Sequence, residues 1–292
     1  MRYIGNKTEL LDFIEKPLID NNITNGVFCD IFAGTTNVSK YFKKKNYNII
    51  SNDNMSYSYV FQKTYVENNL LTLKFSNLSD QISNPSLPKI IKYLNELHGI
   101  EGFIFKNFSK NHLNESIWQR NYFSVTNAKR IDALREKIEE WEEKGCLTEI
   151  EYYVLLCAII ERIPYVSNIS GTYGAFLKIN NPRMFKPFTI EVPKLIVNNS
   201  TNVCYNEDSN NLIKNIEMDI LYIDPPYNHR QYPANYHIWE SVSVWDKTIT
   251  NTKTGLRDYE KQKSLFCSKT KCAQTFENLI KNAKSKYILF QL

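Results

Sequence analysis

Short apolar segments, each followed by a helical pattern, constrain the fold of this chain most strongly. Val27–Phe32 is an apolar run, and the small and polar residues after it lead into a helical pattern that begins at Asn37. Tyr47–Asp53 is a second run that ends in an acid, and Tyr57–Tyr65 follows it as a helix. Strands that alternate with helices in this way are typical of a parallel sheet in an α/β fold.

The helix pattern changes in the middle of the chain. From about Leu71 to Asn199 the sequence predicts helices and polar loops, including a capping box of Thr148 and Glu151 at the start of one helix. Strand patterns return over 202–205, 218–223 and 287–290. We therefore expect residues 1–70 and 200–292 to form one α/β domain, and residues 71–199 to form a mainly helical insert. The last predicted strand stops at the end of the chain, so the sheet looks incomplete there.

Composition limits the class of protein further. The 292 residues are 42% hydrophobic, which is enough for one α/β core and a smaller inserted domain. No stretch reaches the roughly 18 apolar residues that span a bilayer, and the first residues lack an apolar signal segment. We expect a cytoplasmic protein without a membrane partner. The six cysteines have no paired metal-ligand spacing, so no metal site is expected, and a net charge of +5 is compatible with a polyanionic partner but does not identify one.

The tetrapeptide Asp224-Pro225-Pro226-Tyr227 directly follows the predicted strand 218–223 and is the strongest chemical motif. The Asp224 carboxylate and the Pro225 carbonyl offer two hydrogen-bond acceptors, and the prolines stiffen the loop that carries them. Tyr227 offers an aromatic face for stacking. In isolation such a tetrapeptide could equally be a turn, but the carboxyl end of a sheet strand is where open α/β folds bind ligands.

The order of motifs resembles the alpha group of N6-adenine DNA methyltransferases. That group has a cofactor motif at the N-terminus, a Phe-x-Gly loop, a target-recognition insert and then a DPPY loop; here Tyr3-Ile4-Gly5-Asn6-Lys7 and Phe32-Ala33-Gly34 precede Asp224–Tyr227. The resemblance implies a Rossmann-like S-adenosylmethionine-dependent sheet, truncated at its C-terminus, with residues 71–199 as the target-recognition insert. It implies transfer of a methyl group to adenine in double-stranded DNA. It also implies a restriction-modification system with a cognate restriction endonuclease as a partner.

The resemblance implies roles for individual residues. Asp224, Pro225, Pro226 and Tyr227 would be catalytic, with the acceptors drawing the adenine amine toward tetrahedral geometry and Tyr227 stacking on the flipped base. The residues implied in binding the cofactor are Tyr3, Lys7, Asp30, Phe32, Gly34, Asp53 and Asp208. Lys7 would lie near the methionine carboxylate, Gly34 would allow close approach of the backbone, and Asp53 would bind ribose hydroxyls. Thr36 stands where relatives commonly have a second glycine.

Two further loops resemble those of methylases from restriction-modification systems. One spans residues 168–178, and the other spans residues 228–237. Their aromatic and basic side chains could reach DNA bases or phosphates, and we expect contacts from Tyr173, Lys178, Arg230 and Tyr232. Alternatively, both could be packed surface loops. The basic residues Arg120, Lys129, Arg130 and Arg135 could follow phosphates or form a solvated helix face.

Two other functions stay open at this point. RNA amino-methyltransferases share DPPY-type loops, although they generally lack the N-terminal Tyr-x-Gly-x-Lys element, and a truncated chain could be a noncatalytic DNA-binding remnant. Cytosine is a less suitable target, because relatives that methylate its amino group usually have Ser where Asp224 stands.

Overall fold

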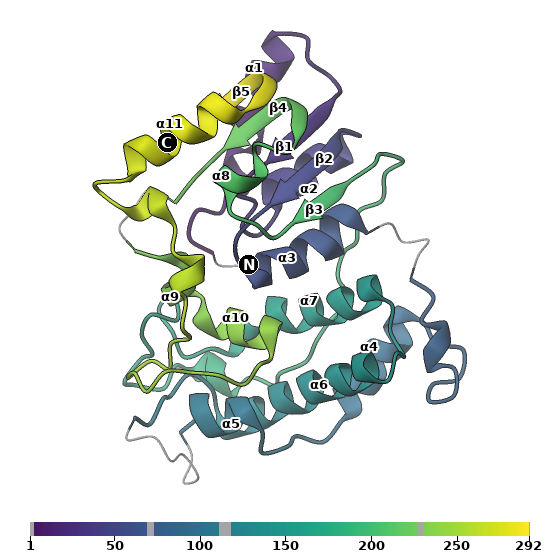
Figure 1. The fold of residues 1–292 in the computed structure, drawn as a ribbon. Coiled ribbons are helices and arrows are strands. Elements are labelled where there is room, and N and C mark those ends of the chain that lie inside the picture. The colour runs from purple at the N-terminus through teal and green to yellow at the C-terminus, as the bar shows by residue number, and fades with distance from the viewer. Residues whose placement is uncertain (1–2, 69–72, 111–117, 227–229, 292) are drawn as a thin grey trace. The chain divides into compact units, whose positions relative to one another are not determined.

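The computed structural model describes residues 3–68, 73–110, 118–226 and 230–291 (Figure 1). The chain divides into two compact units, each built from separate stretches of sequence. The sheet unit comprises residues 5–70, 195–233 and 259–292, and the helical unit comprises residues 1–4, 71–194 and 234–258. Each unit is described by itself below.

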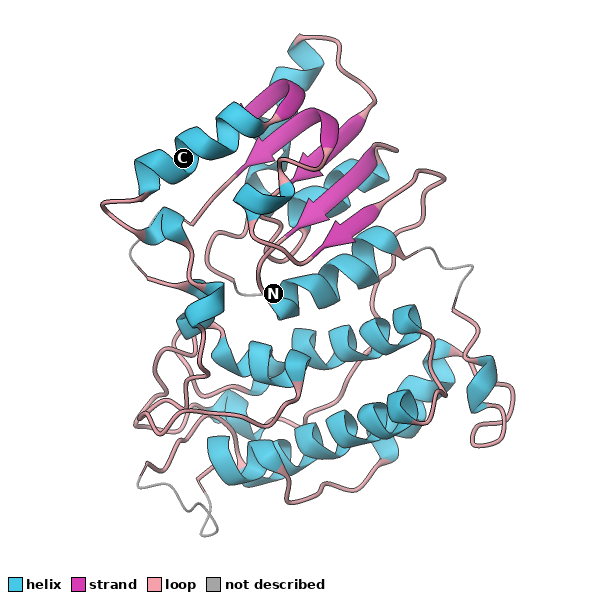
Figure 2. Cartoon of the chain, in the orientation of Figure 1, coloured by secondary structure: helices cyan, strands magenta, loops and turns pink. Residues whose placement is uncertain are grey.

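The sheet unit contains five parallel strands in the order β3-β2-β1-β4-β5 (Figure 2). Their bounds are β1 (Val27–Asp30), β2 (Asn48–Asn52), β3 (Val203–Tyr205), β4 (Glu217–Ile223) and β5 (Lys284–Phe290). The strands β2 and β3 lie on one side of β1, whereas β4 and β5 lie on its other side. The loops after β1 and β4 therefore leave the sheet at the point where the strand order reverses, which is where open α/β sheets bind ligands.

Helices cover both faces of this sheet. Alternate residues of the strands point to opposite faces, so that Phe28 and Ile220 pack on one side, and Cys29 and Leu221 pack on the other. The first face is covered by α1 (Leu11–Asp20), α2 (Asn37–Lys44) and the π-helical turn Lys63–Glu67 that continues α3 (Ser56–Gln62). The second is covered by α8 (Ser209–Leu212) and α11 (Cys272–Asn282). The expected α/β fold is confirmed.

The helical unit is built around two long helices, α6 (Val125–Glu143) and α7 (Glu149–Val166), together with α4 (Leu87–Glu96), α5 (Phe103–Phe108) and α10 (His237–Val244). The short helix α9 (Tyr232–Asn235) spans the boundary between the two units. The predicted capping box at the start of α7 is confirmed, because the Thr148 hydroxyl accepts from the Glu151 amide and the Glu151 carboxylate accepts from the Thr148 amide.

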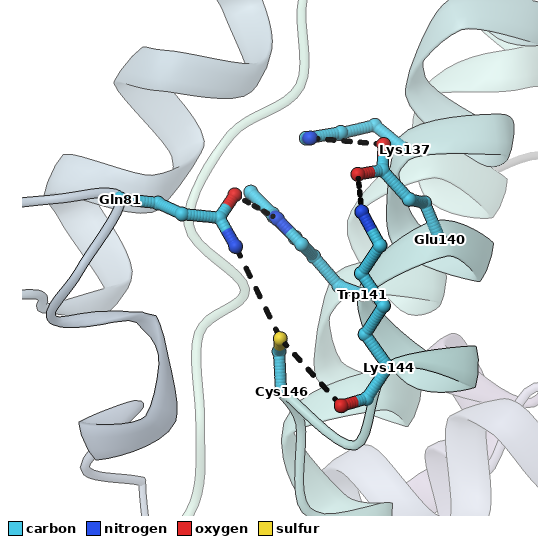
Figure 3. A network of polar contacts seen from close by, with 6 residues as sticks. All are labelled: Gln81, Lys137, Glu140, Trp141, Lys144 and Cys146. Carbon is cyan, nitrogen blue, oxygen red and sulfur yellow. Dashed lines mark hydrogen bonds and ion pairs between the residues drawn. The ribbon is translucent and has the colours of Figure 1, made fainter.

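The C-terminal end of α6 is fixed by a polar network inside the helical unit (Figure 3). The fully buried Trp141 donates its indole N–H to Gln81 at 2.8 Å. One turn of the same helix presents Glu140, which pairs with Lys137 at 2.9 Å and with Lys144 at 2.6 Å (Figure 3). The Trp141–Gln81 bond joins α6 to the loop that precedes α4, whereas the two ion pairs lie along the partly exposed end of α6 itself.

Pro17 lies inside α1 without ending it. The helix continues to Asp20, and Leu18 is buried against the sheet. The assignment of residues 71–199 as a target-recognition insert stays a prediction, and the helical unit that contains most of them also includes residues 234–258. In the described ranges, no helix is long and apolar enough to cross a membrane.

Candidate active site

The loop after β4 carries the predicted catalytic residues. β4 is almost entirely buried, and Asp224, Pro225 and Pro226 follow it without a break. Pro225 is buried, whereas Asp224 and Pro226 are half-buried. Tyr227 lies outside the described residues. Asp224 therefore lies between a buried strand and two prolines with a restricted backbone, and this fixes the position from which its side chain extends.

Asp224 forms an ion pair with Lys7 inside the sheet unit. The Lys7 Nζ lies 3.2 Å from Asp224 Oδ1, and the two side chains are only 11% and 14% exposed. Burial raises the pKa of the Asp224 carboxyl, and the charge and hydrogen bond of Lys7 act in the opposite direction. The structure thus brings a residue of the predicted cofactor motif into contact with the predicted catalytic acid.

The loop after β1 is held in shape by Asp53. Gly34 has a φ of +52°, and Thr36 has a φ of +61°, so both lie in the left-handed region. The Gly34 amide donates to Asp53 Oδ2 at 2.8 Å, and the Met55 amide donates to the other carboxylate oxygen at 2.9 Å. Asp53 therefore connects the ends of β1 and β2. Thr36 adopts the conformation that the expected second glycine would favour.

Asp30 is buried beneath this loop. Its Oδ2 accepts a hydrogen bond from the Ser39 hydroxyl at 2.7 Å and another from the Ser39 amide at 3.2 Å. Burial raises the pKa of Asp30 to about 7, and the charges of Asp224 and Asp53 also raise it. The Asp30 side chain is 1% exposed and is hydrogen-bonded to α2, so it helps to order the loop after β1. Phe32 is half-buried and packs edge-to-face against Phe266, with 5.1 Å between the ring centroids.

Asp208 follows β3 and caps a short helix. Its Oδ1 accepts hydrogen bonds from the amides of Asn210 and Asn211 at 3.0 and 3.1 Å, and the residue is exposed. Its carboxylate is thus ordered at the same edge of the sheet as Asp53 and Asp224, because the strands are parallel.

Asn52 is a site residue that the sequence reasoning missed. Its amide nitrogen donates to the carbonyl oxygens of Ile31 and Glu207, and its Oδ1 accepts from the Glu207 amide at 3.1 Å. Asn52 is 1% exposed and joins the ends of β1, β2 and β3. The sequence signal that could have pointed to Asn52 was an amide side chain inside a predicted buried strand, immediately before Asp53. A polar side chain in such a place is almost always hydrogen-bonded.

Tyr3 is the one predicted cofactor residue that belongs to the helical unit. Its ring packs on Tyr236, with 4.6 Å between centroids, and stacks on Trp239 at 6.0 Å. The neighbouring Ile4 amide donates to the Tyr236 hydroxyl at 2.8 Å. The other six predicted cofactor residues all belong to the sheet unit.

The predicted DNA-contacting residues have different environments. Tyr173 is 1% exposed, and its hydroxyl accepts from the Trp239 indole at 2.9 Å, so it supports the interior of the helical unit. Lys178 and Arg230 are exposed, and Tyr232 is half-buried.

The basic residues of the helical unit are mostly engaged within it. Arg120 and Arg135 are buried and donate to main-chain carbonyls. Arg130 also donates to carbonyl oxygens, and Lys129 pairs with Glu101. Among the described residues, no group of three or more metal-ligating side chains lies together.

Comparisons with known proteins identify the family. The model of the D12 class N6 adenine-specific DNA methyltransferases matches residues 3–290. The chain is 40% identical to the type II methyltransferase M.FokI of Planomicrobium okeanokoites and 38% identical to the modification methylase StsI of Streptococcus sanguinis; each match covers 99% of the chain. It covers 44% of the first protein and 43% of the second, so it spans less than half of either.

A shorter relative is covered over most of its length. The type II methyltransferase M.NlaIII of Neisseria lactamica is 38% identical over 99% of the chain and 82% of its own length. No solved structure matches the chain. The family model and these relatives extend over both units, so the chain belongs to the D12 class of N6 adenine-specific DNA methyltransferases.

Proposed function

We propose that this chain transfers a methyl group from S-adenosylmethionine to the N6 amino group of adenine in duplex DNA, as the modification enzyme of a cytoplasmic restriction-modification system. The observation that carries the proposal is the placement of Asp224 and Pro225 at the end of β4, beside the loop after β1. Methyltransferases of the D12 class use S-adenosylmethionine. The similarity to the type II methyltransferase M.FokI and to the modification methylase StsI supports a modification role.

The chemistry of the adenine amine explains the need for the Asp224 loop. The nitrogen lone pair is delocalised into the ring, so the amine is a poor nucleophile. Hydrogen bonds from the amine to the Asp224 carboxylate and the Pro225 carbonyl draw the nitrogen toward tetrahedral geometry and localise the lone pair. Tyr227, which lies outside the described residues, would stack on the flipped base and contribute about 1–3 kcal/mol.

The donors and acceptors at the same sheet edge fit the cofactor. Lys7 suits a carboxylate, and Asp53 and Asp208 suit hydroxyl and amino groups, while Gly34 lets the main chain approach. When bound, S-adenosylmethionine supplies an electrophilic methyl group on a sulfonium. Phe32 adds an apolar wall, and Asp30 positions the loop through Ser39. The role of Tyr3 in cofactor binding stays a prediction.

Duplex DNA is the proposed substrate, and residues 71–199 are the proposed target-recognition insert. Lys178 and Arg230 are exposed cations on the two loops from which DNA contacts are expected, and Tyr232 is half-buried. These three residues would contact phosphates or bases, whereas the buried Tyr173 would hold the first loop in place. A cognate endonuclease is the proposed partner.

Methyl transfer from labelled S-adenosylmethionine tests the proposal directly. We expect incorporation into duplex DNA, recovery of the label as N6-methyladenine after digestion, and little incorporation into RNA of the same sequence. Asp224→Ala should lower the rate at least about 100-fold, the size of effect seen when one preorganised polar group is removed from a reacting centre. Unchanged methylation by this variant, or a labelled product in RNA alone, would overturn the proposal.

A control variant separates loss of chemistry from loss of folding. Glu217 is the first residue of β4, the strand that precedes Asp224, and its side chain forms only an exposed ion pair with Lys284. The activity of Glu217→Gln should therefore stay close to wild type. Sequencing of modified bases in DNA from cells that express the wild-type chain then gives the methylated motif.

A further inference from the structure

The resemblance assigns Lys7 to the cofactor, whereas the structure shows it beside Asp224. The Lys7 Nζ lies 3.2 Å from Asp224 Oδ1, and both side chains are nearly nine-tenths buried. Gly5, two residues before Lys7, has a φ of +79°, which turns the chain just before the lysine. The lysine therefore reaches Asp224 from a separate segment of the sheet unit.

The electrostatic surroundings explain why a cation belongs there. Three carboxyls, Asp30 on β1, Asp53 after β2 and Asp224 after β4, stand at one edge of the sheet, and the charges of Asp53 and Asp224 both raise the pKa of Asp30. Tyr222 on β4 also faces Asp224 and carries no positive charge. Burial favours the neutral form of Asp224, and Lys7 favours its ionised form.

We propose that Lys7 is the positioning residue of Asp224: its ammonium keeps this carboxyl ionised and in place, so that both oxygens stay acceptors for the adenine amine. This inference rests on the proposed function. A protonated Asp224 would carry a donor O–H, and one oxygen would no longer accept from the amine. Lys7 therefore acts on the reaction through Asp224, in addition to any contact with the cofactor.

The pH dependence of turnover distinguishes this role from cofactor binding alone. Lys7→Met removes the ammonium and keeps an unbranched side chain of similar length. The pKa of Asp224 should then rise, so the acid limb of the kcat profile, measured with saturating cofactor and DNA, should move to higher pH by about one unit or more. Lys7→Arg keeps the charge and should restore the limb to within a few tenths of a unit.

A second readout does not depend on turnover. The double-mutant cycle of Lys7→Met and Asp224→Asn, followed by urea unfolding without cofactor, measures the coupling between the two side chains. We expect Lys7→Met to destabilise the protein clearly less when Asp224 is already Asn. Lys45→Met is the matched control, because Lys45 forms a half-exposed ion pair with Glu15 in the same unit and should leave the pH profile unchanged.

The outcomes separate the inference from the proposed function. If the wild-type chain methylates no adenine, the proposed function fails, and this inference fails with it. If the wild type is active but Lys7→Met only weakens cofactor binding measured by calorimetry, with the acid limb unmoved, the inference alone is overturned. Additive effects in the double-mutant cycle would also contradict it.

Discussion

At the residue scale, the site depends on backbone conformations that few side chains tolerate. Gly34 and Thr36 both have left-handed φ values, and the Gly34 amide is bonded to Asp53. Glycine adopts this conformation at little cost, whereas a β-branched residue such as Thr36 is strained in it. The Thr36 hydroxyl donates to the Thr35 carbonyl at 2.7 Å, which helps to hold the turn.

Gly34→Ala should therefore destabilise the protein by about 1 kcal/mol and weaken binding of S-adenosylmethionine, because the added methyl group meets an unfavourable φ and stands where the main chain should approach the cofactor. Thr36→Gly is the matched comparison and should change stability by less than about 1 kcal/mol, since relief of strain offsets the lost packing. Thermal unfolding and calorimetry measure both effects. Equal cofactor affinity in Gly34→Ala and wild type would contradict this prediction.

How far the site could be predicted also differs from residue to residue. The position of Asp224 after a strand and of Gly34 after another follows from sequence order, because parallel strands end at one edge of a sheet. The pairing of Lys7 with Asp224, and the bonds of Asn52 to Glu207, depend on contacts across 217 and 155 positions of sequence, and no local pattern encodes such contacts. Burial of Tyr173 was likewise invisible, since tyrosine occurs both inside proteins and at nucleic-acid interfaces.

At the element scale, the start of α5 is stabilised by a side chain from another helix. Asp132 of α6 accepts from the amides of Ile104 and Phe105 at 2.8 Å each, and so caps α5. The sequence predicted α7 from its capping box, which is a local signal. It did not predict α5, whose cap lies 28 residues away.

Asp132→Ala should destabilise the protein by about 2–4 kcal/mol, because two buried amides would lose their acceptor. Glu101→Ala, which removes an exposed ion pair with Lys129 in the same unit, should cost less than about 1 kcal/mol. Urea unfolding followed by circular dichroism gives both values. A cost below about 1 kcal/mol for Asp132→Ala would show that water replaces the carboxylate.

At the scale of the whole molecule, two buried ionisable groups, His237 and Asp30, make the stability of the protein depend on pH in opposite directions. Burial lowers the pKa of His237, in the helical unit, to about 4. Between about pH 6.5 and 4 the unfolded chain therefore binds a proton that the folded chain does not, and stability is lost as the pH falls. Asp30, in the sheet unit, has a pKa of about 7, so its burial costs stability as the pH rises from about 4 to 7.

His237→Gln isolates the first of these effects. The difference in unfolding free energy between wild type and variant should shrink on acidification by about 1.4 kcal/mol for each pH unit between 6.5 and 4. Chemical unfolding at several pH values measures it, with His98→Gln as the control, because His98 is exposed. A difference that stays constant over this interval would show that His237 is already charged in the folded protein.

The discontinuity of the two units has a consequence for engineering and for evolution. The backbone passes between them at residues 4–5, 70–71, 194–195, 233–234 and 258–259. A graft that moved only the long helical stretch from one methylase to another would leave behind residues 234–258, which supply α10 and the buried Trp239. Exchange of the helical unit between two methylases, in the laboratory or by recombination, would therefore need residues 71–194 and 234–258 to move together.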